Sequence, residues 1–199
     1  MASKYEPFLS SDEEDALLDI ARRAIETFVR SAKRLDPEQC PITETMQEHH
    51  GAFVTLHQND QLRGCIGHIH HTMPLVEAVI ESAINAASKD PRFEALPPQE
   101  LDDITIEISA LVWGDTPETP FVTVNEIDEI VIGRDGLYIE IPPHRGGLLL
   151  PQVATERGWD SIQFLESVCR KAGYPDDAWK QPDAKLYRFC AQVFGEGGN

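Results

Sequence analysis

The chain has 199 residues, of which 34 are acidic and 17 are basic, so its formal net charge at pH 7 is -17. This length favours a single domain, and the 41% of apolar residues supply enough material for a hydrophobic core. Because a strongly anionic chain repels phosphate backbones and anionic lipid heads, we expect binding neither to nucleic acid nor to a membrane surface.

The N-terminal sequence and the cysteines indicate where the protein resides. The first 15 residues are too acidic for a transit peptide and lack the apolar centre of a signal peptide, and no long uncharged apolar segment follows. The four cysteines (Cys40, Cys65, Cys169 and Cys190) are widely spaced and form no CxxC pair, which favours reduced thiols. We therefore expect a cytoplasmic protein, with flexible ends at residues 1–10 and 197–199.

A long amphipathic helix is predicted near the N-terminus. Ser11 and Glu14 match the spacing of a capping box, and apolar residues recur at helical intervals from Leu17 to Ala32. This pattern predicts a helix that runs to about Leu35.

Two strands, residues 52–57 and 62–68, are predicted to form a hairpin. A two-residue turn would place Arg63 opposite Leu56. We favour a three-residue turn over residues 58–60 because it pairs Leu56 with Leu62, an apolar residue with an apolar one. In this register, one face of the hairpin carries Leu56 and Leu62. The opposite face carries Phe53, Thr55, Arg63 and Cys65.

A largely apolar helix is predicted after Pro74, and it ends near Asp90 because the residue before a proline is disfavoured in a helix. Residues 104–109 alternate between apolar and polar, as in a strand.

The second half repeats this order of elements. The predicted strands cover residues 130–132, 137–141 and 148–150; helices follow Pro151 and Asp160, the second reaching Lys171; and a last strand covers residues 185–194. Each half thus runs strand, turn, strand, proline, helix. This repetition predicts an internal duplication of a strand-turn-strand-helix unit, with two lobes at about residues 11–113 and 121–196.

Several motifs in a fixed order make the chain similar to a known family. They are Leu62-Arg63-Gly64-Cys65-Ile66-Gly67, Asp90-Pro91-Arg92-Phe93, Gly133-Arg134-Asp135-Gly136-Leu137, Leu148-Leu149-Leu150-Pro151-Gln152-Val153-Ala154, Gly158-Trp159-Asp160 and Lys171-Ala172-Gly173. Together they resemble the AMMECR-like domain family over residues 11–196. The resemblance implies an α+β fold with a barrel-like, mainly antiparallel sheet and flanking helices. It also implies an accessory protein of the AmmeMemoRadiSam system, whose partners are a Memo-like protein and a radical SAM protein.

Cys65 and Arg63 are the candidate catalytic residues. Both point to the same side of an extended strand, and a guanidinium beside a thiol favours the nucleophilic thiolate. Gly64 and Gly67 would let another backbone or a ligand approach closely. The alternative is that Cys65 is a small packing residue under a helix.

Asp90, Arg92, Glu107 and Gln152 are the candidate binding residues, together with His68. Asp90 either closes an Asp-Pro turn or pairs with Arg92 or Arg63. Glu107 can orient an arginine from the polar face of its strand, and Gln152 lies at a helix start.

We expect neither a metal nor another cofactor. His68, His70 and His71 follow Cys65 closely, but Cys65 and His68 are an odd number of residues apart and would face opposite sides of a strand. The favoured interpretation is an accessory protein with a ligand or partner site around the 62–67 strand, and a homodimer is left open. The alternative is an enzyme that uses Cys65 as an Arg63-activated nucleophile.

Overall fold

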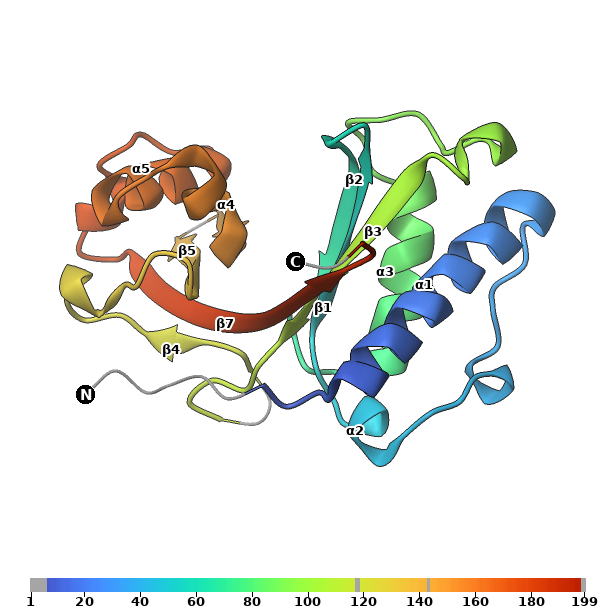
Figure 1. Ribbon diagram of the computed structural model, residues 1–199. Helices are drawn as coiled ribbons and strands as arrows, with labels where there is room; N and C mark the ends of the chain where they lie inside the picture. Colours follow the sequence, from blue (N-terminus) through green and yellow to red (C-terminus); the bar gives the residue numbers. More distant parts are fainter. Residues whose placement is uncertain (1–6, 117–118, 143, 198–199) are drawn as a thin grey trace. The chain divides into compact units, whose positions relative to one another are not determined.

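The computed structural model describes residues 7–116, 119–142 and 144–197, and the chain divides into two compact units (Figure 1). Unit 1 comprises the chain up to Leu111 together with Gln192 and the residues after it, and unit 2 comprises Val112–Ala191. Strand β7 (Lys185–Gly195) therefore contributes to both units. Of the ends predicted to be flexible, residues 1–6 and 198–199 lie outside the described residues, whereas Leu9 is buried and its N–H donates to the Gln192 side chain.

Helix α1 spans Ser11–Ser31 and begins one residue earlier than its predicted capping box. Ser10 is the N-cap, its hydroxyl accepts from the Glu13 N–H, and the Glu13 carboxylate accepts in return from the Ser10 N–H. The helix ends before Leu35 because Ala32 adopts a left-handed conformation with φ 56°. The predicted amphipathic helix is confirmed, with both ends corrected.

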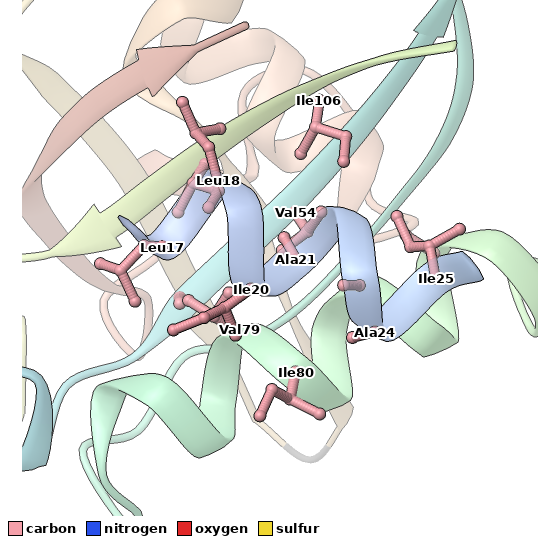
Figure 2. Close-up of a cluster of buried hydrophobic side chains, with 14 of the residues drawn as sticks. Leu17, Leu18, Ile20, Ala21, Ala24, Ile25, Val54, Val79, Ile80 and Ile106 are labelled. Carbon is pink, nitrogen blue, oxygen red and sulfur yellow. The ribbon is translucent and has the colours of Figure 1, made fainter. Parts of the chain in front are cut away.

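The core of unit 1 lies between one face of an antiparallel sheet and two helices. The sheet contains β1 (Ala52–Gln58), β2 (Gln61–His68), β3 (Ile104–Leu111) and the end of β7, in the order β2-β1-β3-β7. Helices α1 and α3 (Leu75–Ser88) cover this face (Figure 1). Figure 2 shows the side chains that meet there: Leu17, Leu18, Ile20, Ala21, Ala24 and Ile25 of α1, Val79 and Ile80 of α3, Val54 of β1 and Ile106 of β3.

The turn of the β1–β2 hairpin has two residues, so the predicted three-residue turn is wrong. Asn59 and Asp60 both have positive φ, as in a type I′ turn, and Gln58 pairs with Gln61. The register then shifts by one residue: His57 pairs with Leu62, but the next residue of β1, Leu56, pairs with Gly64. Arg63 has no partner residue in β1 and is therefore the extra residue of a β-bulge. Beyond this bulge the two strands pair residue by residue again.

Unit 2 has its own core, and its strands continue the sheet in the order β7-β5-β6, where β5 is Asp135–Ile141 and β6 is His144–Leu149. Strands β5 and β6 form a hairpin, and β5 also pairs with β7. Helices α4 (Pro151–Arg157) and α5 (Ser161–Lys171) pack against this hairpin. The buried cluster between them includes Leu137, Ile139, Phe164, Leu165 and Val168. The predicted Asp160 cap of α5 is confirmed.

At the start of unit 2, one predicted strand is wrong and one short strand was missed. Residues 130–132 do not form a strand, because the Arg134 and Asp135 N–H groups both donate to the Val131 carbonyl and fold this segment into a turn. The two-residue strand β4 (Val122–Thr123), which pairs with β7, was not predicted. The remaining short elements are η1 (Pro37–Gln39), α2 (Glu44–Gln47), η2 (Pro98–Glu100), η3 (Ile127–Glu129) and η4 (Ala178–Lys180).

The predicted α+β class, with a mainly antiparallel sheet and flanking helices, is confirmed. Each unit contains a hairpin, a proline and a helix in this order, as the repetition in the sequence predicts. The internal duplication itself stays a prediction. Among the described residues, no helix combines the length and the apolar character that crossing a membrane requires.

Candidate functional site

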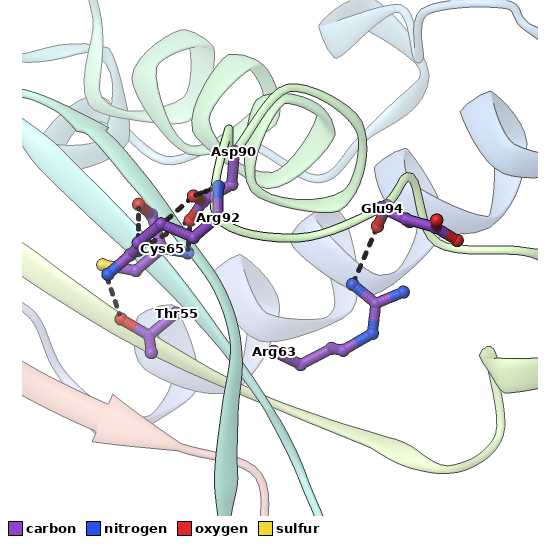
Figure 3. Close-up of polar contacts among 6 residues, drawn as sticks. All are labelled: Thr55, Arg63, Cys65, Asp90, Arg92 and Glu94. Carbon is purple, nitrogen blue, oxygen red and sulfur yellow. Dashed lines mark hydrogen bonds and ion pairs between the residues drawn. The ribbon is translucent and has the colours of Figure 1, made fainter.

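Asp90 and Arg92 hold the peptide groups of Cys65 on the outer edge of β2 (Figure 3). Strand β2 is the last strand of the sheet in unit 1, and no strand of the described residues pairs with its outer edge. The Cys65 N–H donates to Asp90 Oδ2 at 2.8 Å, and Arg92 Nη2 donates to the Cys65 carbonyl at 3.3 Å. A carboxylate and a guanidinium thus occupy the positions of the C=O and N–H of a missing strand.

The Asp90–Arg92 pair is itself a two-point ion pair. Arg92 Nε donates to Asp90 Oδ1 at 2.9 Å, and Arg92 Nη2 donates to Asp90 Oδ2 at 2.6 Å. The chain turns locally to allow this, since the Arg92 N–H also donates to Asp90 Oδ1 at 3.1 Å. Asp90 is only 4% exposed, whereas 45% of the Arg92 side chain is accessible. Both predicted roles of Asp90 occur together, because the Phe93 N–H also closes the turn onto the Asp90 carbonyl.

These contacts set the ionisation of Asp90. The Arg92 hydrogen bonds hold the pKa of Asp90 at about 2, and the N–H groups of Cys65 and Arg92 act in the same direction. Burial opposes this shift but is outweighed. Asp90 is therefore an anion at neutral pH, and the Asp90 carboxylate in turn raises the pKa of Arg92.

Arg63 is not directed at Cys65 as predicted. Arg63 Nε donates to Glu100 Oε2 at 3.0 Å, and Arg63 Nη1 donates to the Glu94 carbonyl at 2.9 Å (Figure 3 shows the Glu94 contact). The β-bulge causes this difference, because one extra residue breaks the alternation on which the prediction relied. Arg63 thus ties β2 to the segment that contains η2.

The Cys65 thiol lies in a cross-strand row with Thr55 and Glu107. Thr55 of β1 pairs with Cys65 on one side and with Glu107 of β3 on the other. The Thr55 hydroxyl donates to Cys65 Sγ at 3.3 Å. Burial is the main cause that raises the pKa of Cys65, and the charges of Asp90 and Glu107 add to it. The Thr55 hydrogen bond and the charge of Arg92 oppose this rise without cancelling it. The thiol is therefore the neutral form at pH 7.

Gly64 and Gly67 allow close approaches, as the sequence predicts, but the approaching groups belong to the protein. A Cβ on Gly64 would lie 2.3 Å from the carbonyl oxygen of Ala86 in α3. A Cβ on Gly67 would lie 2.4 Å from the Phe53 ring. Gly64 lets β2 pack directly under α3, and Gly67 makes room for an aromatic ring on the opposite face.

His68 lies on the helix-covered face, because it pairs with the buried Ala52 and its Nε2 lies 3.5 Å from a carboxylate oxygen of Glu81 in α3. It thus faces away from Cys65, as their odd separation predicts. In the described part of the chain, no group of three or more His, Cys, Asp or Glu side chains is arranged to hold a metal ion.

The structure gathers some of the predicted site residues and separates others. Cys65, Asp90 and Arg92 contact one another, and Glu107 lies in the Cys65 row. Gln152 lies in unit 2, at the start of α4. The role of Glu100 was missed, and no sequence motif signals a partner 37 residues beyond Arg63.

Comparisons with known proteins cover nearly the whole chain. The AMMECR1 family model matches residues 18–194. A protein from Methanothermobacter thermautotrophicus is 47% identical over 199 residues, which cover 98% of this chain and 100% of that relative. A protein from Thermococcus kodakarensis is 45% identical over 185 residues, covering 90% of this chain and 88% of the relative. The crystal structure of an uncharacterized protein from Pyrococcus horikoshii has a TM-score of 0.83 and 39% identity, covering 92% of this chain and 90% of that one.

Proposed function

This chain belongs to the AMMECR1 family, and we propose that it is a cytoplasmic accessory protein that binds a Memo-like protein and a radical SAM protein. The family resemblance expected from the sequence motifs is confirmed. The two partners and the location rest on that resemblance alone. The site proposed for partner binding is the outer edge of β2 with Asp90 and Arg92.

Arg92 is both held in place and accessible, and this combination supports a binding role. Its guanidinium is fixed by two bonds to Asp90 and one to the Cys65 carbonyl, yet 45% of the side chain is accessible. A partner that contacts it loses little side-chain freedom, because the arginine is already ordered. Arginine is one of the residue types enriched among those that dominate binding energy in protein interfaces.

The surroundings of Cys65 favour binding over nucleophilic catalysis. Its pKa is raised by burial, its thiol contacts the Thr55 hydroxyl, and Arg63 contacts Glu94 and Glu100. A nucleophilic cysteine needs a lowered pKa or an adjacent base. We therefore do not extend the proposal to an Arg63-activated Cys65 enzyme.

Binding measurements with purified proteins test the proposal. The probes are a purified Memo-like protein and a purified radical SAM protein, each titrated against the full chain. We expect Arg92→Ala to weaken binding by about tenfold or more, as for an interface hot spot. Arg34→Ala is the matched control, because the Arg34 side chain is 47% accessible and is also paired with a carboxylate.

Arg92→Lys is a second variant for the case that Arg92→Ala does not fold. It keeps the positive charge beside Asp90 but loses the two-point contact. If neither protein binds the wild-type chain, the proposed partners are wrong. If both bind and Arg92→Ala binds as tightly as Arg34→Ala, the proposed site is wrong.

A further inference from the structure

The outer edge of β2 has an open position next to the Asp90–Arg92 pair. In an antiparallel pair of strands, successive residues point their backbone groups alternately toward the neighbouring strand and away from it. The Cys65 N–H and C=O point outward, toward Asp90 and Arg92, so those of Gly67, two residues further along β2, also point outward. No hydrogen bond from the described residues reaches Gly67 from outside the strand pair. Gly67 thus presents one backbone donor and one acceptor at the edge.

This position is accessible. Gly67 is partly exposed and has no side chain, so its exposed surface belongs to the main chain. The Phe53 ring covers the face of Gly67 on which a Cβ would lie, 2.4 Å from that Cβ position. Beyond β2 the chain turns toward Gly51, since the carbonyl oxygens of His68 and Ile69 lie 2.5 and 2.6 Å from the Cβ position of that glycine. Because Gly51 directly precedes β1, this turn leads away from the outer edge.

Arg92 leaves one of its donors unused beside this position. Its Nε and Nη2 bind Asp90, and Nη2 also donates to the Cys65 carbonyl. Nη1 has no hydrogen-bond partner among the residues that the structure describes. The guanidinium lies over the Phe93 ring at 5.4 Å, and 45% of the side chain is accessible. Arg92 is thus an ordered, accessible cation with two N–H groups available at Nη1.

The order of these groups along the edge determines what can bind there. Along β2, the Cys65 N–H comes first, then the Cys65 carbonyl, and then the Gly67 N–H. Arg92, which binds the carbonyl, therefore stands between Asp90 and Gly67. An added strand that runs antiparallel to β2 pairs with Gly67 first and meets Arg92 next, because Arg92 and Asp90 occupy the place of its following residues. Such a strand has to end there, beside a cation.

We propose that this edge binds the C-terminal residue of an extended partner segment that pairs antiparallel with β2. The terminal carboxylate accepts hydrogen bonds from the Gly67 N–H and from Arg92 Nη1, and the N–H of the same residue donates to the Gly67 carbonyl. A parallel segment would instead bring its terminal ammonium to Arg92, and these like charges repel each other. The proposal rests on the proposed binding role of the β2 edge and names the kind of segment that binds there.

Two further features narrow the chemistry of the segment. Residues directly opposite each other in a sheet share a face, so the terminal side chain lies on the face of Gly67 that carries the Phe53 ring. An apolar terminal residue suits this contact with an aromatic ring. The net charge of -17 disfavours additional carboxylates, so the other residues of the segment are neutral or basic.

Selection from a library of random octapeptides with free C-termini tests the proposal on the full chain. We expect the selected peptides to end in an apolar residue. The tightest is synthesised as the free acid and as the C-terminal amide, and both are titrated calorimetrically at about 0.15 M salt. The amide should bind about tenfold or more weakly, because it loses the charge-assisted bond to Arg92. Arg92→Ala should weaken binding of the free acid to the same extent, and Arg34→Ala is the control, because Arg34 is similarly accessible and also paired with a carboxylate.

Hydrogen exchange measured by NMR locates the bound peptide. In the free chain, the Gly67 N–H should exchange faster than the Cys65 N–H, which is bonded to Asp90. The peptide should slow the exchange of Gly67 more than that of Cys65.

The amide comparison uses the unaltered protein, so it decides the matter even if Arg92→Ala does not fold. The proposal is overturned if no peptide is selected, if the amide binds as tightly as the free acid, or if the peptide leaves the exchange of Gly67 unchanged. If peptides bind as expected but the Memo-like and radical SAM proteins do not, only the proposed partners are wrong. If those proteins bind but no C-terminal peptide does, only the proposed pairing with β2 is wrong.

Discussion

Asp90 Oδ2 accepts a hydrogen bond from the Cys65 N–H at 2.8 Å, although 25 residues separate the two in the chain. Arg92 Nη2 donates to the Cys65 carbonyl, so the Asp90 and Arg92 side chains together cover both backbone groups of Cys65 on the outer edge of β2. Exposed strand edges invite pairing with other chains. The same pair thus orders Arg92 and shields the edge of the sheet.

Replacing the Asp90 side chain should destabilise the protein. Asp90→Ala removes the acceptor of the Cys65 N–H and leaves Arg92 without its ion pair. We expect the free energy of unfolding to fall by about 2–4 kcal/mol, measured by urea denaturation. Asp102→Ala, at an exposed position, should change it by less than about 0.5 kcal/mol. Equal midpoints for the two variants would contradict the structural role of Asp90.

The stability should depend on pH through Asp90. Its pKa is about 2 in the folded state against an ordinary value of 3.8. Its contribution is therefore complete above about pH 4 and is lost as the pH falls toward 2. We expect the free energy of unfolding to fall by about 2 kcal/mol over this window. In Asp90→Asn, the free energy of unfolding should change less with pH over the same window.

Glu13 titrates in the same range, since hydrogen bonds from Thr43 and the Ser10 N–H hold its pKa at about 2. Glu13→Gln should therefore also flatten the profile, independently of Asp90. Unfolding curves collected between pH 2 and pH 5 separate the two contributions. An unchanged slope in Asp90→Asn would show that Asp90 is not a titrating group of the folded state.

Alkylation of Cys65 distinguishes a packed thiol from an activated one. Because burial raises its pKa, iodoacetamide should modify Cys65 more slowly at pH 7 than it modifies a free thiol. Mass spectrometry of the modified peptide gives the rate at each pH. Arg63→Ala should leave this pH profile unchanged, as Arg63 contacts Glu94 and Glu100. A shift of the profile to higher pH in that variant would restore the nucleophile hypothesis.

Two glycine substitutions should differ in cost. A Cβ at Gly64 would lie 2.3 Å from a backbone oxygen of α3, whereas the atoms nearest to a Cβ at Gly146 are ring and hydroxyl atoms of the Tyr138 side chain and not backbone. We expect Gly64→Ala to lower the free energy of unfolding by about 2–3 kcal/mol and Gly146→Ala by less than about 1 kcal/mol. Denaturation of the two variants checks this order, and a reversed order would mean that β2 is not packed tightly under α3.

Local signals were sufficient to predict the elements and part of the site. Asp160 caps α5 as predicted, and Asp90 pairs with Arg92 only two residues away. Such relations depend on short spacings that the sequence displays directly. The residues that meet around Cys65 were also partly predictable, because the favoured register places Thr55 and Cys65 on the same face, where the structure pairs them.

The errors arose where distant groups decide the backbone conformation. Arg63 is displaced by a bulge whose position depends on how two strands pair, and alternation alone does not reveal it. Residues 130–132 have the composition of a strand, but buried Asp135 takes the Val131 N–H and the chain turns there. Both effects depend on tertiary contacts that outweigh local preference.

The course of β7 also affects how the protein is made. Residues 185–191 belong to unit 2, whereas Gln192 and the residues after it complete unit 1, where Glu196 pairs with Arg22 near the other end of the chain. A ribosome therefore releases all of unit 2 before it releases the last strand of unit 1. Unit 1 stays incomplete until residues 192–197 have been synthesised, and nascent chains that stop before residue 192 lack the strand that completes it.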